Sequence, residues 1–140
     1  MTHMFSIVDA ESDEVYANNG MLSITVSDEL ILYISDSLKW IDSLWNGKEL
    51  KQSINYYGFS YIEGENIERL ALITKRWANL FECIKTDKAL LTFGSVIEEN
   101  KVLTDKREID VDQFRKMLLQ INGICTVAKK EGKKILYNGI

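Results

Sequence analysis

The chain has 140 residues, of which 46% are hydrophobic and 27% are charged, a composition typical of one globular domain that needs no metal or disulfide support. The net charge of −4 is uneven, because residues 1–50 hold nine acids and two bases whereas residues 51–140 hold twelve acids and fifteen bases. The acidic part is unsuited to gripping phosphates, so we expect no direct binding of nucleic acid. It is suited to a basic protein partner.

Hydropathy and the cysteine content indicate the compartment in which the protein is expected. No stretch approaches the roughly 18 apolar residues of a membrane span, and residues 1–20 lack the apolar run of a signal peptide. Cys83 and Cys125 have no metal-binding spacing. We therefore expect a cytoplasmic protein with no membrane association, no metal and no cofactor.

The first predicted elements are two strands joined by an acidic loop. Phe5–Val8 is expected to begin a strand, and Asp9–Glu14 is expected to form a loop. Ala17–Gly20 has turn chemistry, because Asn and Gly tolerate left-handed backbone. Met21–Ser27 alternates apolar and polar residues and contains β-branched side chains, which predicts the second strand.

A helix is predicted over residues 27–47, with a Ser or Asp cap at its start and Asn-Gly at its end. At about 100° per residue, one face of it carries an apolar stripe made of Ile31, Ile34, Leu38, Ile41 and Trp45. Tyr33 and Trp40 fall on the opposite face, beside Glu29 and Asp36. Aromatic residues among acids on an outer face are typical of a protein interface. The alternative is a helix that buries both faces between two layers.

The rest of the chain mixes strands and helices. The predicted elements are an aromatic core strand at Ser53–Ile62, a helix at Glu65–Lys85, a hairpin of Ala89–Glu99 with Lys101–Ile109, a helix at Val111–Glu131 and a short strand in Lys133–Ile140. There is no regular βαβ rhythm. We therefore expect an α+β fold in a single domain over residues 1–140, with a mainly antiparallel sheet and about three helices.

Groups that do catalytic chemistry are scarce. His3 is the only histidine, and it lies in an N-terminus expected to be mobile. Both cysteines fall on or beside apolar helix stripes, where a thiol behaves as a small hydrophobe. The cluster "YYGFSY" lacks the interleaved Arg or Lys that single-strand binders use. We therefore expect that the protein is not an enzyme and has no catalytic residues.

Several motifs in residues 55–140 resemble small bacterial immunity proteins, which are encoded beside polymorphic and contact-dependent growth-inhibition toxins. The resemblance lies in "ITKRWANLF", "LLTFGSV" and "KKILYNGI", and the matching positions are Trp77, Leu80, Phe81, Gly94, Ile135, Leu136, Gly139 and Ile140. The end reads "ILYNGI" where the family has a histidine and a leucine in its middle. The resemblance implies a non-catalytic inhibitor of a cognate toxin domain, often a nuclease. It assigns no functional residues, because the shared positions are structural.

The main hypothesis is therefore an immunity protein whose partner is a basic toxin C-terminal domain. The expected contacts are the acids and outer-face aromatics of the first forty residues: Asp9, Glu11, Asp13, Glu14, Glu29, Tyr33, Asp36 and Trp40. Two alternatives stay open. One is a regulatory or adaptor module with an endogenous protein partner, and the other is an enzyme that uses carboxylates alone, which predicts a concave pocket whose carboxyl groups have raised pKa values.

Overall fold

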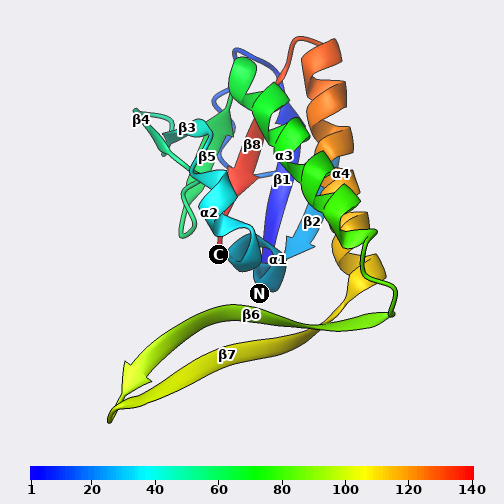
Figure 1. Cartoon of the computed structure of the whole chain (residues 1–140). Helices are drawn as coiled ribbons and strands as arrows, with labels where there is room; N and C mark the ends of the chain where they lie inside the picture. The colour runs from blue at the N-terminus through cyan, green and yellow to red at the C-terminus, as the bar shows by residue number, and fades with distance from the viewer.

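Six of the eight strands form one sheet in which every neighbouring pair is antiparallel. The chain is described over residues 1–140 by a computed structural model, shown in Figure 1. The strand order across the sheet is β2 (Ser23–Ser27), β1 (Thr2–Val8), β8 (Lys134–Asn138), β5 (Phe59–Ile62), β3 (Asp42–Trp45) and β4 (Glu49–Gln52). The C-terminal strand therefore lies at the centre of the sheet, between the first strand and β5.

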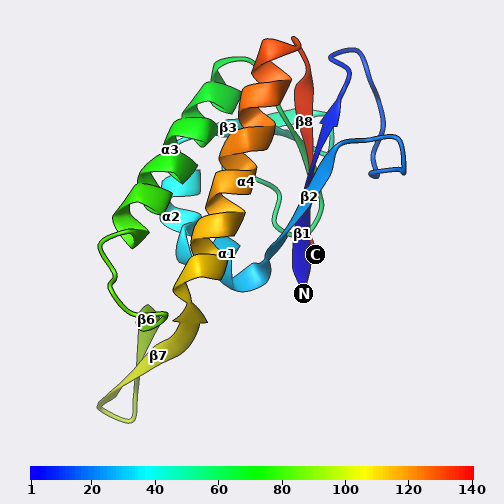
Figure 2. The ribbon, with the colours of Figure 1, turned by 90° about the vertical axis from the view of Figure 1, so that its right-hand side faces the viewer.

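Two long helices cover one face of this sheet. α3 (Glu65–Phe81) and α4 (Val111–Lys130) lie side by side on it, as Figures 1 and 2 show. The side chains of Leu70, Leu118 and Ile121 are fully buried between the helices and the sheet. Burial of each contributes about 1.5–3 kcal/mol to folding, so this layer is the main core of the domain.

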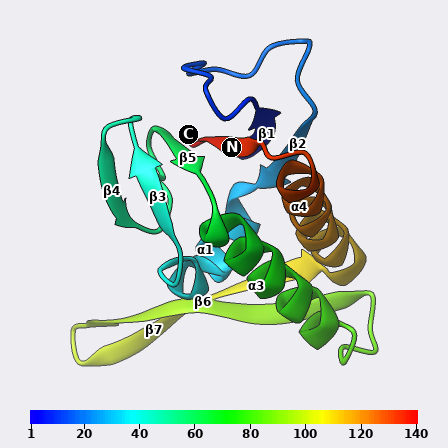
Figure 3. The same cartoon turned by 90° about the horizontal axis from the view of Figure 1, so that it is seen from above.

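The opposite face of the sheet carries a smaller apolar cluster made by Val8, Tyr61 and Leu136. The β1–β2 connection lies on this side and is bonded to the sheet: the Tyr61 hydroxyl donates to the Glu14 carbonyl, and the Asn138 side-chain amide donates to the Val15 carbonyl at 2.7 Å. In Figure 3 this connection and α3 lie on opposite sides of the molecule.

The remaining two strands form a hairpin that does not join the main sheet. β6 (Lys88–Glu98) and β7 (Lys101–Asp110) pair only with each other and project from the domain (Figure 1). The base is anchored, because Ile109 is buried and the Phe93 ring lies 5.3 Å from the Tyr33 ring. The hairpin predicted from the sequence is confirmed, with residues 99 and 100 at its turn.

The predicted α+β class and the mainly antiparallel sheet are confirmed, as are both long helices and the closing strand. α3 ends at Phe81, four residues earlier than expected. The Asp110 side chain caps α4 by accepting from the Gln113 backbone N–H at 3.0 Å. There are four helices rather than about three, because the first predicted helix is divided.

The prediction of one helix over residues 27–47 is wrong. The segment forms α1 (Asp28–Tyr33) and α2 (Ser35–Leu38), which are separated at Ile34 and followed by the strand β3. The Ile34 carbonyl accepts from the Ser37 hydroxyl at 2.7 Å, a local bond that competes with continuation of the helix. The apolar stripe itself is buried as far as Ile41, so the periodicity located the core correctly.

The same two residues that predicted a helix end, Asn46-Gly47, instead form a hairpin turn. Both have positive φ, 54° and 69°, which is the backbone of a type I′ turn, and they connect β3 to the unpredicted strand β4. Asn-Gly signals either structure, and the pairing of β3 with β5 decides between them. The predicted strand at Ser53–Ile62 is likewise shorter: only Phe59–Ile62 is strand, and Ser53 has a φ of 68°.

Candidate functional site

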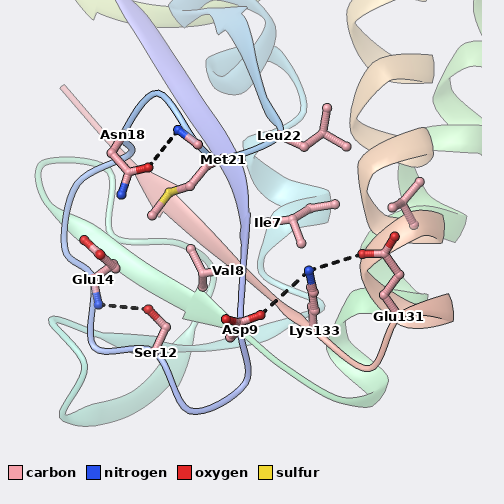
Figure 4. Close-up of a pocket in the computed structure, with 12 residues that line it drawn as sticks. Ile7, Val8, Asp9, Ser12, Glu14, Asn18, Met21, Leu22, Glu131 and Lys133 are labelled. Carbon is pink, nitrogen blue, oxygen red and sulfur yellow. Dashed lines mark hydrogen bonds and ion pairs between the residues drawn. The ribbon is translucent and has the colours of Figure 1, made fainter.

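The four acids predicted in the β1–β2 connection lie together on the surface. We call the segment Asp9–Tyr16 the acidic loop; its acidic side chains Asp9, Glu11, Asp13 and Glu14 are all exposed. Asp9, Ser12 and Glu14 line a pocket of about 410 Å³, together with residues of β1, of the segment that leads to β2 and of the α4–β8 connection (Figure 4). The loop therefore borders a hollow surface rather than a flat one.

The acidic loop has a defined conformation. The Ser12 N–H donates to the Asp9 carbonyl at 2.9 Å, and the Glu14 N–H donates to the Ser12 hydroxyl at 3.2 Å. Together with the bonds from Tyr61 and Asn138 described above, these contacts hold the loop against the sheet. Its carboxylates are thus presented by an ordered backbone, which reduces the entropy lost when a partner binds.

Most of the negative charge in the acidic loop is not neutralised within the protein. Asp9 forms an ion pair with Lys133 at 3.7 Å, and Lys133 is also 3.5 Å from Glu131 (Figure 4). The other three acids, Glu11, Asp13 and Glu14, make no ion pair. Three exposed carboxylates within four residues attract a positively charged partner.

The neighbouring Tyr61 responds to this charge. Burial raises the pKa of the Tyr61 phenol, and the carboxylates of Asp13 and Glu14 raise it further because they disfavour a phenolate nearby. The same negative potential that stabilises the neutral phenol favours cations above the loop.

An aromatic residue that the sequence interpretation missed belongs to this loop. Tyr16 is 77% exposed and lies two residues after Glu14 in the chain. Aromatic residues surrounded by polar groups are frequent energetic anchors of interfaces. The sequence does carry a signal for an exposed side chain here, since Tyr16 lies between the acids of the loop and the predicted turn. The helical pattern at Tyr33 and Trp40 is stronger, so the aromatic contacts were predicted at those two residues instead.

The other four predicted contacts are not close to the acidic loop. β1 and β2 are antiparallel, so the loop that joins them lies at one end of the sheet and α1, which follows β2, lies at the other. Glu29 is 3.9 Å from Arg107 of the hairpin, and Asp36 pairs with Lys39 at 2.9 Å. The eight residues therefore do not form one surface.

The two aromatic residues predicted to share a face also separate. Tyr33 is half-buried and packs edge-on against Trp77 at 5.6 Å, so its placement on an outer face is wrong. Trp40 is 67% exposed, as predicted. The break at Ile34 gives the two residues different directions, because they no longer follow one helical axis.

Trp40 instead borders a shallow apolar groove of about 400 Å³ between α2 and α3. We call this the α2–α3 groove; it is lined by Trp40, Arg69, Leu72, Ile73, Arg76, Trp77 and Leu80. The Trp77 indole N–H donates to the Ser37 hydroxyl at 2.9 Å and holds the two helices together beneath the groove. Large exposed apolar side chains gathered in one place are characteristic of binding surfaces.

The expectation that His3 is mobile is wrong. His3 lies in β1 and is fully buried. Its Nε2 is 2.9 Å from the Asp28 carboxylate, and its Nδ1 is 2.6 Å from the Tyr137 hydroxyl. Because a carboxylate only accepts, Nε2 donates to Asp28, and in the neutral ring Nδ1 accepts from Tyr137. The Tyr56 hydroxyl also donates to Asp28, which completes a polar cluster of four residues.

Burial and hydrogen bonds tune this cluster. Desolvation acts to raise the pKa of Asp28, but the bonds from Tyr56 and His3 outweigh it and hold that pKa below its ordinary value. Burial and the Asp28 carboxylate raise the pKa of Tyr56 to about 12. Burial also raises the pKa of Tyr137. These contacts join β1, β8, α1 and the segment before β5, so the cluster fastens the N-terminus to the centre of the fold.

Three further observations concern the kind of site. No group of three or more His, Cys, Asp or Glu side chains is placed to hold a metal ion. None of the helices has the length and apolar content needed to cross a membrane. Comparison of the chain with protein-family models, with characterised proteins and with solved structures finds no match. The functional argument therefore starts from the surfaces described above.

Proposed function

We propose that this chain is a non-catalytic, cytoplasmic immunity protein that binds a cognate bacterial toxin domain and blocks its active or substrate-binding site. The observation that carries the proposal is the acidic loop, in which three unpaired carboxylates and an exposed tyrosine are presented by an ordered backbone. The sequence resemblance in residues 55–140 supports the same function.

The chemistry of the loop favours a basic partner. Toxin domains that cleave nucleic acids need positive surfaces to hold phosphates, and unpaired carboxylates compete for such a surface. The acids accelerate encounter and select the partner, while Tyr16 provides apolar contact area with a hydroxyl at its rim. An inhibitor of this kind needs no catalytic group, since occupying the substrate surface is sufficient.

The test is co-expression of this chain with the product of the adjacent gene, followed by copurification and a growth assay. One variant removes three charges, Glu11→Gln, Asp13→Asn and Glu14→Gln. The matched control removes three other exposed acids that form no ion pair, by Asp87→Asn, Glu108→Gln and Asp112→Asn.

We expect the loop variant to bind the toxin at least about tenfold more weakly, with a smaller dependence on salt, and the control to bind as the wild type does. Tyr16→Ala should cost roughly 2 kcal/mol of binding energy, because the ring is the apolar anchor of the contact. A wild-type chain that neither copurifies with the neighbouring toxin nor protects cells from it contradicts the proposal. Stable association with an endogenous protein in cells without any toxin would favour the regulatory or adaptor module instead.

A further inference from the structure

The β6–β7 hairpin carries an apolar tip that nothing in its own chain covers. Ile97 is 80% exposed, and Val96, Val102 and Leu103 are also exposed. Val96 lies opposite Leu103, and Ile97 lies opposite Val102, so successive pairs place apolar side chains on both faces of the hairpin. A two-stranded hairpin is marginally stable alone in water, and this tip lacks the core contacts that hold its base.

The turn of the hairpin adds negative charge at a conformational cost. Glu98 and Glu99 make no ion pair, and Glu99 and Asn100 have φ values of 49° and 62°. A turn of this type is normally made by Asn-Gly, and a side chain as long as Glu is disfavoured in the left-handed region. The tip thus combines aliphatic side chains with two carboxylates that form no ion pair, beside the exposed Lys101, which lies opposite Glu98 in the hairpin.

The α2–α3 groove has the complementary chemistry. Its apolar part is formed by Trp40, Leu72 and Leu80, all of which are exposed. Arg69 and Arg76 lie at its border, and neither guanidinium has a carboxylate partner. Arg69 makes one long contact of 3.4 Å to the Trp40 carbonyl. The groove therefore offers apolar area and two free cations, where the tip offers apolar area and two free anions.

The tip cannot fill the groove of its own chain. The base of the hairpin is fixed by the contact of Phe93 with Tyr33 and by Arg107, which lies over the Phe93 ring at 4.6 Å. From this base the hairpin extends away from α3, and its tip lies at the far end of the molecule from the long helices (Figure 1). The occupant that the surface chemistry matches is therefore the tip of a second copy.

We propose that two copies of this chain form a dimer by exchanging hairpins, with the tip of each β6–β7 hairpin seated in the α2–α3 groove of the other. A two-fold axis makes the exchange reciprocal, so both tips and both grooves are covered and the assembly is closed. Glu98 and Glu99 pair with Arg69 and Arg76 of the other copy. The acidic loop lies on the opposite side of the sheet from α3 and stays free (Figure 3), so this inference goes beyond the proposed function.

The test is the mass of the purified protein in solution, measured by light scattering and sedimentation over a wide range of concentrations. A tip-reversed variant carries Glu98→Arg and Glu99→Arg, and a groove-reversed variant carries Arg69→Glu and Arg76→Glu. We expect a wild-type dimer, and we expect each reversed variant alone to dissociate, with a dimer dissociation constant at least about a hundredfold higher. Lys116→Glu with Lys130→Glu, unpaired and exposed on α4, is the control and should remain dimeric.

Mixing the two reversed variants is the decisive experiment. In the mixture each basic tip meets an acidic groove and each acidic tip meets a basic groove, so a one-to-one heterodimer should form. Ile97→Lys in the wild-type background should weaken the dimer without altering the contacts that anchor the base of the hairpin. A monomeric wild-type chain, a dimer that both reversals leave intact, or a mixture that stays monomeric would each overturn the proposal. Toxin binding is not measured, so these outcomes are independent of the proposed function.

Discussion

Removal of the buried imidazole, His3→Ala, should destabilise the fold although the residue lies at the third position of the chain. The imidazole is fully buried and bonded at both nitrogens, to Asp28 at 2.9 Å and to the Tyr137 hydroxyl at 2.6 Å. A hydrogen bond to a charged group contributes about 1.5–3 kcal/mol, and a buried hydroxyl left without a partner costs about 1–3 kcal/mol. We therefore expect a loss of about 3–5 kcal/mol in the free energy of unfolding, including the cavity.

A double-mutant cycle with Tyr137→Phe separates the hydrogen bond from the cavity. Tyr137→Phe alone leaves Nδ1 of His3 without its donor, and His3→Ala alone leaves the Tyr137 hydroxyl unpartnered. In the double variant neither group is orphaned, so the combined loss should be smaller than the sum by about 1–2 kcal/mol.

The assay is urea unfolding of all four proteins, followed by tryptophan fluorescence and circular dichroism. A loss below about 1 kcal/mol for His3→Ala would mean that the N-terminus is not fastened as described, and strict additivity would refute the bond to Tyr137.

Two further predictions concern Asp28 and the C-terminus. The pKa of Asp28 is lowered in the folded chain from an ordinary value of 3.8, so its carboxylate stabilises the fold above that pH and loses this effect as the pH falls through the lowered pKa. The difference in unfolding free energy between wild type and Asp28→Asn should therefore shrink below about pH 4. A difference that stays constant from pH 6 to 2 would contradict this. A Cβ on Gly139 would overlap the Tyr56 carbonyl and lie 2.9 Å from the Asn55 carbonyl oxygen. Gly139→Ala should therefore lower the free energy of unfolding in urea by about 2–4 kcal/mol. Gly94→Ala is the control, because its Cβ would meet open space, and it should change the free energy of unfolding by less than about 0.5 kcal/mol.

The long helices show how far local patterns reach. Leu70 and Ile73 belong to the buried face of α3, and α4 begins at the Asp110 cap and buries the face through Leu118. Period and capping are properties of neighbouring residues, so they can be read without knowing what packs against them. The alternation of Met21–Ser27 located β2 for the same reason.

Asn46-Gly47 shows where local patterns stop. The dipeptide tolerates left-handed backbone and so can end a helix or turn a hairpin. The dipeptide forms a hairpin turn here because Leu44 and Trp45 of β3 pair with Tyr61 and Ser60, which are distant in the chain. Likewise, the periodicity of the first helix continued beyond Ile34, but packing against the sheet and α3 placed Tyr33 inside and Trp40 outside.

The candidate site also has a part that local sequence predicts and a part that depends on the tertiary fold. Local sequence alone showed that the N-terminal part is acidic and that four of its nine acids fall in one loop, because charge and loop composition need no tertiary information. The positions of Glu29, Tyr33, Asp36 and Trp40 away from that loop follow from the fold, since the antiparallel return of β2 places α1 at the other end of the sheet. The tertiary structure also decided that His3 is a buried hydrogen-bonding centre, because its partners Asp28, Tyr56 and Tyr137 are brought to it by three separate crossings of the chain.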